Sequence, residues 1–290
     1  MEPEPVPRPV AGLRAVLDRG WRIFATGLSF ASFGIGGLLL WAFVFPWVRW
    51  RYRHDPLRRR QRARAIVQRS FATFIEWLRG LGVLTYEFHG EEKLRRPGLL
   101  VLANHPTLLD VVFLVSRMPD ADCVVRTGLF TNPFTGGPVR ATDYISNRGG
   151  PDLVDDCIRS VRGGSSLIIF PEGTRTKPGQ EPELQRGAAN IAVRGAIDLT
   201  PVSIRCDPPT LSKGVPWYRV PTRRFHVTIR VHDDIPLMSL LGPGRSEAAQ
   251  ARDVTDWLKR FFFEGGADGR IGQGDQGIDH RVAGTGRHHD

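Results

Sequence analysis

The sequence contains little cysteine, with three residues in a chain of 290 and no Cys-x-x-Cys spacing. This scarcity argues against a disulfide scaffold or a zinc site, so we interpret Cys123, Cys157 and Cys206 as reduced thiols of a core. The Gly-x-Ser-x-Gly pattern that carries a serine nucleophile is also absent. Acidic residues are outnumbered, 30 against 40 Lys and Arg, for a net charge of +10. The excess predicts an anionic partner, either nucleic acid or an acidic lipid surface.

Charge is missing altogether from Ile23 to Val48, a stretch of 26 residues. About 20 apolar residues in a helix cross the hydrocarbon core of a bilayer, so we predict a membrane segment over residues 21–50, after an N-terminal tail over 1–20. Glycines in the middle of the segment leave two forms open, a single span or a re-entrant hairpin. These glycines are Gly34, Gly36 and Gly37.

Basic residues are denser after the apolar segment than before it. This asymmetry predicts that the globular part lies on the cytoplasmic face, of the inner membrane if the protein is bacterial. Residues 51–81 are typical of a basic amphipathic helix, which either lies among anionic headgroups or packs on the domain. The adjacent apolar segment and the lack of an aromatic-lined basic groove favour lipid over nucleic acid. The arginines at the start of this helix are Arg58, Arg59, Arg60, Arg62 and Arg64.

Residues 82–264 alternate between strand-like and helical runs, a pattern that predicts an α/β domain with a central sheet covered by helices. Ligands of such sheets bind beyond the strand ends. Residues 265–290 are rich in glycine and are expected to be a disordered tail. The expected strands are Leu84–Phe88, Leu99–Ala103, Asp122–Arg126, Leu167–Phe170, Thr200–Arg205 and Phe225–Val231, and the expected helices are Pro106–Arg117, Asp152–Arg162 and Leu184–Arg194.

A histidine and an aspartate follow the second of these strands. Pro106 suits the first position of a helix, which puts His105 just before the helix and Asp110 about one turn inside it. The carboxylate can then reach back to one ring nitrogen, fix the tautomer and leave the other nitrogen as a proton acceptor. Such a pair can deprotonate an alcohol without a covalent enzyme intermediate. On this motif alone, a helix-capping histidine with a surface aspartate remains an alternative.

The strand-like run Leu167–Phe170 leads directly into the sequence Pro-Glu-Gly-Thr-Arg. Gly173 permits close approach of a ligand, Thr174 offers a hydroxyl, and Arg175 offers a planar fork suited to phosphate. Glu172 either binds a hydroxyl of the ligand or braces the arginine. A plain surface turn is the alternative, but the histidine motif in the same chain favours an anion-binding cradle.

Taken together, these stretches resemble the glycerolipid acyltransferase family typified by 1-acylglycerol-3-phosphate acyltransferases. That family carries a histidine and an aspartate separated by four residues, as in His105–Asp110, and then the block Phe-Pro-Glu-Gly-Thr-Arg, as in Phe170–Arg175. Arg126–Arg148 resembles the second block of the family, and Thr200–Val202 resembles the fourth. The similarity covers about residues 60–240.

The resemblance implies acyl transfer from a thioester of coenzyme A or acyl carrier protein to the hydroxyl of a lysophospholipid such as 1-acylglycerol-3-phosphate, with no cofactor and no metal. His105 would be the general base and Asp110 its orienting partner. Two departures, Arg126 where a lysine is common and Asn147 in place of an acidic residue, leave the acceptor headgroup open. The implied substrate-binding residues are Glu172, Gly173, Thr174, Arg175, Arg148 and Arg126.

Three alternatives remain open from the sequence. The same histidine and aspartate would also suit a hydrolase that activates water on a thioester or lysolipid. The acceptor could instead belong to a specialised lipid or pigment pathway. A non-catalytic lipid-binding protein of the membrane surface is the third alternative.

Overall fold

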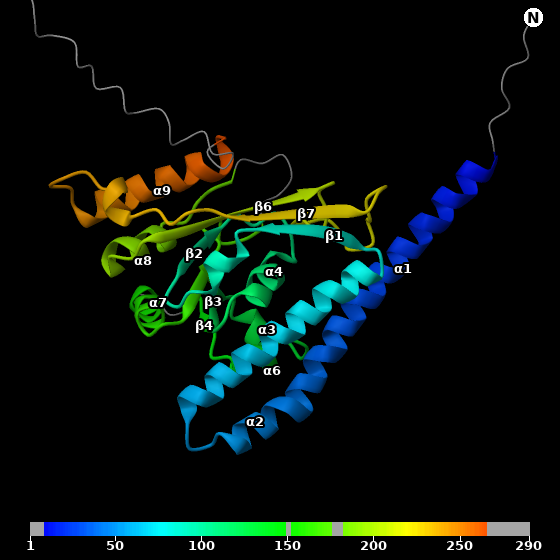
Figure 1. Cartoon of the computed structure of the whole chain (residues 1–290), viewed down its shortest axis with the longest axis horizontal. Helices are drawn as coiled ribbons and strands as arrows, with labels where there is room; N and C mark the ends of the chain where they lie inside the picture. Colours follow the sequence, from blue (N-terminus) through cyan, green and yellow to red (C-terminus); the bar gives the residue numbers. More distant parts are fainter. Residues whose placement is uncertain (1–8, 149–151, 176–181, 266–290) are drawn as a thin grey trace, which may run out of the picture.

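The computed structural model describes residues 9–148, 152–175 and 182–265. Figure 1 shows a twisted sheet with helices on both faces and a long N-terminal helix running beside it. The predicted α/β class, with a central sheet covered by helices and preceded by an apolar and an amphipathic helix, is confirmed. The expected tail over 265–290 lies outside the described residues except for Gly265.

The sheet has seven strands in the order β1-β7-β6-β2-β5-β3-β4. Neighbouring strands are parallel except for the antiparallel pair of β6 and β7. Strands β6, β2, β5, β3 and β4 therefore all end at the same edge. The strands are β1 (Leu84–His89), β2 (Leu100–Ala103), β3 (Ala121–Val125), β4 (Ile145–Ser146), β5 (Ser166–Ile169), β6 (Leu199–Asp207) and β7 (Phe225–Val231).

Successive side chains of the central strand β2 feed two separate cores, because they point to opposite faces of the sheet. Val101 and Ala103 belong to the core beneath α3 and α4, whereas Leu100 and Leu102 belong to the core beneath α7, α8 and α9. These helices are α3 (Pro56–Gly80), α4 (Asp110–Arg117), α7 (Asp152–Arg162), α8 (Gly187–Gly195) and α9 (Glu247–Phe263).

The N-terminal helices form one unbroken helical run. Helix α1 (Pro9–Leu39) continues through a π-helical turn (Leu40–Val44) into α2 (Phe45–Arg51). The portion Val16–Arg51 is long and apolar enough to cross a membrane, by length and composition. The hairpin broken at the mid-segment glycines does not form, and residues 9–20, assigned to a tail from the sequence, are helical.

The glycines of α1 have a packing role instead. The loop before α6 (Gly136–Ala141) lies against α1, and a Cβ added at Gly37 would stand 2.1 Å from the carbonyl oxygen of Phe134. A Cβ at Gly34 would stand 3.2 Å from the ring of the same phenylalanine. Glycine is therefore required here for close approach, which explains why these residues do not interrupt the helix.

The chain reverses between α2 and α3, where the Asp55 side chain accepts the backbone N–H of Arg58 at 2.9 Å. Helix α3 then runs back alongside α1 (Figure 1). Its apolar side contacts both neighbours: Val67 is buried in the domain core, and Phe74 packs on Phe33 of α1 with ring centroids 5.1 Å apart. Packing on the domain, one of the two interpretations left open for this helix, is therefore confirmed for its apolar side.

Arg64 of α3 points into the domain. It is 2% exposed and forms ion pairs with Asp120 at 3.1 Å and with Asp122 at 2.7 Å. Burial lowers the pKa of Arg64, but the two carboxylates outweigh this and leave the pKa raised. The buried charge therefore ties α3 to the start of β3.

Candidate active site

The predicted site residues follow neighbouring strands that end at one edge of the sheet. His105 follows β2, Arg126 follows β3, and Glu172 follows β5. Leu211, in the loop after β6, completes the cluster. This agrees with the expectation that ligands of such sheets bind beyond the carboxyl ends of the strands.

The predicted contact between histidine and aspartate is present. Nδ1 of His105 lies 2.8 Å from Oδ2 of Asp110, whose side chain is fully buried, while the histidine side chain is 18% exposed. The helix begins at Asp110, so the prediction that Pro106 starts it was wrong. Residues 104–109 instead form a loop, because the carboxylate of Asp110 turns back and accepts hydrogen bonds from Thr107, through its backbone N–H at 2.7 Å and its hydroxyl at 2.5 Å.

Asp110 is thus an acceptor for three donors in a dry environment. Burial raises the pKa of Asp110, and the hydrogen bonds from His105 and Thr107 oppose that rise. These donors favour the ionised form, which accepts a hydrogen bond from Nδ1–H of His105 and leaves Nε2 as the proton acceptor. The imidazole is therefore fixed in both its orientation and its tautomer.

Glu172 supports the histidine rather than the arginine. Its Oε1 accepts the backbone N–H of His105 at 2.7 Å, and among the described residues nothing donates to its buried Oε2. Burial raises the pKa of Glu172 to about 7. The suggestion that Glu172 braces Arg175 was wrong, because its hydrogen bond joins the two motifs at the histidine.

The ring of Phe170 stacks on the imidazole of His105, with centroids 4.1 Å apart and planes 21° apart. The chain then turns sharply, and the N–H of Gly173 donates to the carbonyl of Phe170 at 2.9 Å. Gly173 has a φ of 63°, a left-handed conformation that favours glycine. The histidine motif and the Pro-Glu-Gly-Thr-Arg turn therefore form one continuous surface.

Two arginines flank this turn. Nη1 of Arg175 donates to the carbonyl of Leu211 at 2.8 Å, and Nη2 of Arg126 donates to the carbonyl of Gly173 at 3.3 Å. Burial lowers the pKa of Arg175; of the nearby charges, that of Asp110 raises it and that of Arg126 lowers it further. Two guanidinium groups that repel each other at a sheet edge form a setting in which a bound anion is stabilised.

Two further residues of the site were not singled out from the sequence. The amide of Asn104 donates to the carbonyl of Ile204 at 2.8 Å and accepts the N–H of the same residue at 2.7 Å, which anchors the loop to β6. The carbonyl of Leu211 also accepts the N–H of Leu108 at 3.2 Å. Asn104 directly precedes the histidine, so its position was a usable signal, whereas nothing in the sequence indicates Leu211.

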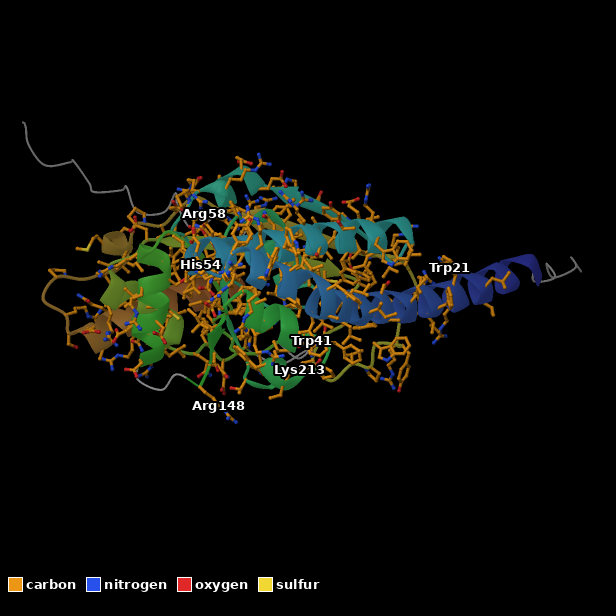
Figure 2. The ribbon with its side chains drawn as sticks, turned by 90° about the horizontal axis from the view of Figure 1, so that it is seen from below. Trp21, Trp41, His54, Arg58, Arg148 and Lys213 are labelled. Atoms are coloured by element: carbon orange, nitrogen blue, oxygen red, sulfur yellow. The ribbon has the colours of Figure 1, made fainter. Side chains whose placement is uncertain are left out.

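Thr174 and Arg148 are the remaining predicted residues. Thr174 is half-buried beside Gly173. Arg148 follows β4 at the same sheet edge as Arg126, and Figure 2 shows its exposed side chain projecting from the edge of the molecule. Within the described ranges it makes no hydrogen bond or ion pair with the other predicted site residues, so its role stays a prediction. Among the described residues no group of three His, Cys, Asp or Glu side chains is placed to hold a metal.

Several known proteins resemble this chain. Residues 85–205 match an acyltransferase family. The chain is 32% identical over 198 residues to a putative 1-acyl-sn-glycerol-3-phosphate acyltransferase of Caenorhabditis elegans, covering 63% of this chain and 67% of that protein. It is 29% identical over 239 residues to a 1-acyl-sn-glycerol-3-phosphate acyltransferase of Pseudomonas aeruginosa, covering 78% and 88%.

The fold has a counterpart among solved structures. The 1-acyl-sn-glycerophosphate acyltransferase PlsC of Thermotoga maritima superimposes with a TM-score of 0.60 at 19% identity, covering 83% of this chain and 97% of that one. This superposition shows the shared fold, and the relatives above confirm the sequence resemblance: the chain belongs to the glycerolipid acyltransferase family and is an acyltransferase.

Proposed function

We propose that the protein transfers a fatty acyl group from a thioester of coenzyme A or acyl carrier protein to the hydroxyl of a lysophospholipid, with 1-acylglycerol-3-phosphate as the first acceptor to test. The observation that carries this proposal is the 2.8 Å contact between His105 and buried Asp110 beside a turn with two arginines. Two relatives named for this acceptor support the choice.

His105 acts as the general base in this proposal. Nε2 takes the proton of the acceptor hydroxyl while the oxygen of that hydroxyl attacks the thioester carbonyl carbon. The C–S bond then breaks, the proton passes to the departing sulfur, and the products are an ester and a free thiol. General-base assistance of this kind contributes roughly 10² to 10⁴ in rate. Asp110 stabilises the imidazolium that forms in between.

The cysteines argue for direct transfer rather than an acyl-enzyme. Burial raises the pKa of both Cys157 and Cys206 to about 12, and Cys123 is fully buried with its pKa raised as well. A thiol nucleophile reacts as its thiolate, and these thiols are protonated at neutral pH. They support the interpretation of reduced core thiols.

Arg126 and Arg175 bind the phosphate of the acceptor in this proposal, and Gly173 leaves room for it at the turn. Arg148 is proposed to assist from the neighbouring strand end. The apolar run Val16–Arg51 is proposed to hold the enzyme at a membrane, with the catalytic domain on the cytoplasmic face, so that lipid acceptors reach the site from the bilayer.

An acceptor screen tests the proposal against its alternatives. Purified protein is given labelled acyl-coenzyme A or acyl carrier protein with a panel of lysophospholipids and neutral alcohols, and lipid mass spectrometry identifies the products. Acylated 1-acylglycerol-3-phosphate supports the proposal. Free fatty acid as the sole product would assign thioester hydrolysis, and acylation of a phosphate-free acceptor alone would assign a specialised lipid pathway.

A further inference from the structure

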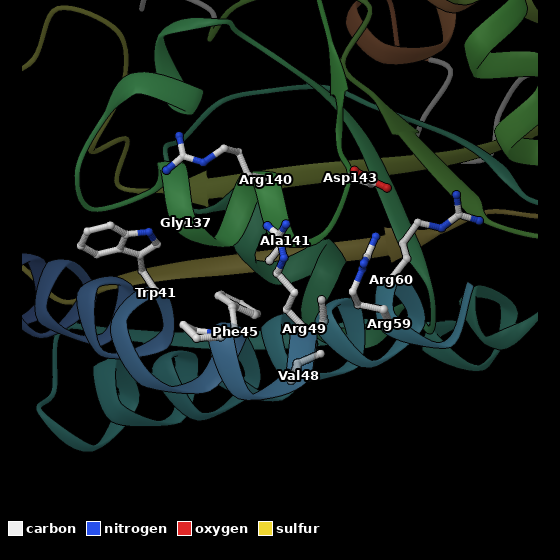
Figure 3. Close-up of a pocket in the computed structure, with 12 residues that line it drawn as sticks. Trp41, Phe45, Val48, Arg49, Arg59, Arg60, Gly137, Arg140, Ala141 and Asp143 are labelled. Atoms are coloured by element: carbon white, nitrogen blue, oxygen red, sulfur yellow. The ribbon is translucent and has the colours of Figure 1, made fainter. Parts of the chain in front are cut away.

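A cavity separate from the candidate active site lies where the N-terminal helices meet α6. It is a cavity of about 460 Å³, lined by residues of the π-helical turn, α2, α3 and α6. Figure 3 shows the lining side chains that these elements contribute. None of the lining residues belongs to the candidate active site, so acyl transfer as proposed above leaves this cavity without a role.

Positive charge dominates the lining. Arg49 of α2, Arg59 and Arg60 of α3, and Arg140 of α6 line the cavity, with Asp143 as the one acidic side chain among the lining residues. We call this cavity the arginine pocket. Three cations in excess at one concave surface repel one another, and an anion among them relieves this repulsion.

Most of these guanidinium groups have no hydrogen-bond or ion-pair partner among the described residues. Arg140 donates to the carbonyl of Phe130. In the parts of the chain that the structure describes, the side chains of Arg49, Arg59 and Arg60 make no hydrogen bond or ion pair, and Nε of Arg60 is buried without a partner. A buried donor without an acceptor is destabilising, so a ligand that supplies an acceptor is favoured here.

The remaining walls are apolar. Phe45 and Val48 are buried at the base, and the indole of Trp41 stands at the side with half its surface exposed. Trp47 and Trp50, also on α2, are exposed as well. Exposed tryptophans at the end of an apolar helix are typical of the membrane–water boundary, which places the arginine pocket at the depth of lipid headgroups.

Helix α6 approaches the π-helical turn closely at Trp41. Trp41 belongs to the π-helical turn, and a Cβ added at Gly137 of α6 would stand 2.4 Å from its Cβ. Helix α6 therefore packs directly on this turn and fixes the mouth of the cavity. Single π-helical turns inside α-helices are frequent at functional sites.

We propose that the arginine pocket binds the phosphate headgroup of an anionic phospholipid, with the acyl chains lying along the apolar side of α1 and α2. A cavity of this size holds a headgroup, whereas a stable protein partner needs about 800 Å² of surface on each side. The occupant is a lipid of the surrounding membrane, so this site does not depend on the identity of the acyl acceptor.

Two matched double variants test this proposal, R59Q/R60Q and R58Q/R62Q. Each removes two arginines from α3, but only the first pair lines the arginine pocket. Binding of dioctanoyl phosphatidylglycerol, which is neither the proposed acceptor nor its product, is measured on the full chain in neutral detergent micelles. We expect one saturable site in the wild type, binding weakened about tenfold or more in R59Q/R60Q, and less than about twofold in R58Q/R62Q.

Equal weakening in both variants would assign the binding to diffuse surface charge and overturn the pocket. Inorganic phosphate that binds as tightly as the lipid would overturn the lipid as its occupant. Displacement of the lipid by acyl carrier protein, sensitive to R59Q/R60Q, would assign the pocket to an acidic protein instead. Thermal unfolding checks that both variants fold. If R59Q/R60Q does not fold, the binding measurement is repeated with Arg49→Gln, on the exposed side of α2. His105→Ala should bind the lipid like the wild type, which separates this result from the acyl-transfer proposal.

Discussion

The backbone N–H of His105 donates a 2.7 Å hydrogen bond to Oε1 of Glu172, across 67 residues of sequence. This bond joins the histidine motif to the Pro-Glu-Gly-Thr-Arg turn, and the stacked ring of Phe170 reinforces the junction. Glu172 therefore holds the backbone of His105, the base of the proposed mechanism. Because its carboxyl is buried with one oxygen unpartnered, this arrangement has a measurable dependence on pH.

Glu172→Gln should change how stability depends on pH. The pKa of Glu172 is raised from an ordinary 4.5 to about 7, so between these values the folded chain keeps a proton that the unfolded chain has lost. The free energy of unfolding of the wild type therefore falls as pH rises through this window, by about 3 kcal/mol, and levels off above it. Glutamine still accepts the N–H of His105 but does not titrate.

Unfolding of both proteins by denaturant at several pH values, followed by tryptophan fluorescence, gives this difference directly. Groups that titrate in both proteins, Asp110 among them, cancel in the comparison. Curves that stay parallel from about pH 4.5 to about pH 7 would show that Glu172 titrates normally and is not buried as described.

Asp110→Asn should lower the rate of acyl transfer by about 10² or more while the acceptor KM changes little. The carboxylate of Asp110 accepts hydrogen bonds from three donors, and an amide in its place turns an N–H₂ group toward at least one of them. The imidazole therefore loses its fixed tautomer. Thr107→Val is the matched control, because it removes one donor and leaves the contact between His105 and Asp110. A kcat lowered as much by Thr107→Val as by Asp110→Asn would indicate loss of loop structure instead.

Arg126→Ala should raise the KM for 1-acylglycerol-3-phosphate about tenfold, because a charge-assisted hydrogen bond to phosphate is worth about 1.5–3 kcal/mol. With monoacylglycerol, which lacks phosphate, the same variant should match the wild type. A KM that rises equally for both acceptors would contradict the proposed contact between Arg126 and the phosphate. The same pair of measurements on Arg148→Ala tests whether that exposed arginine takes part.

Gly37→Ala should weaken the docking of α1, whereas Gly36→Ala should not. An added methyl at Gly37 meets the carbonyl of Phe134 at 2.1 Å, and at Gly36 it meets nothing within 4 Å. We expect Gly37→Ala to cost about 1–3 kcal/mol from overpacking and Gly36→Ala to stabilise the helix by about 0.5–1 kcal/mol. Thermal unfolding of the full chain in detergent compares them. Identical midpoints would mean that α1 does not rest on the loop before α6.

Local patterns predicted the elements whose boundaries depend on local chemistry. Helix α7 (Asp152–Arg162) and strand β7 (Phe225–Val231) begin and end where the sequence placed them. The contact between His105 and Asp110 was also predicted, although the helix start assumed for it at Pro106 was wrong. Helix α9 (Glu247–Phe263) was overlooked although its signals are local, since Ser246 caps it and buried apolar residues recur at helical spacing.

Features that depend on distant contacts could not be predicted. The start of α4 at Asp110 is an exception, because the hydrogen bonds from Thr107 that accompany it are local, whereas Pro106 indicated an earlier start. Arg64 looks like its exposed arginine neighbours until Asp120 and Asp122 approach it from another element. Such pairings join parts of the chain that only the folded sheet brings together.

The most direct test of the account is the rate of acyl transfer by His105→Ala, measured with labelled acyl thioester and 1-acylglycerol-3-phosphate beside the wild type. We expect the rate to fall by about 10² to 10⁴, with unchanged attachment to vesicles and an unchanged unfolding temperature. Transfer at the wild-type rate in a folded, membrane-attached His105→Ala protein would contradict the assignment of His105 as the base.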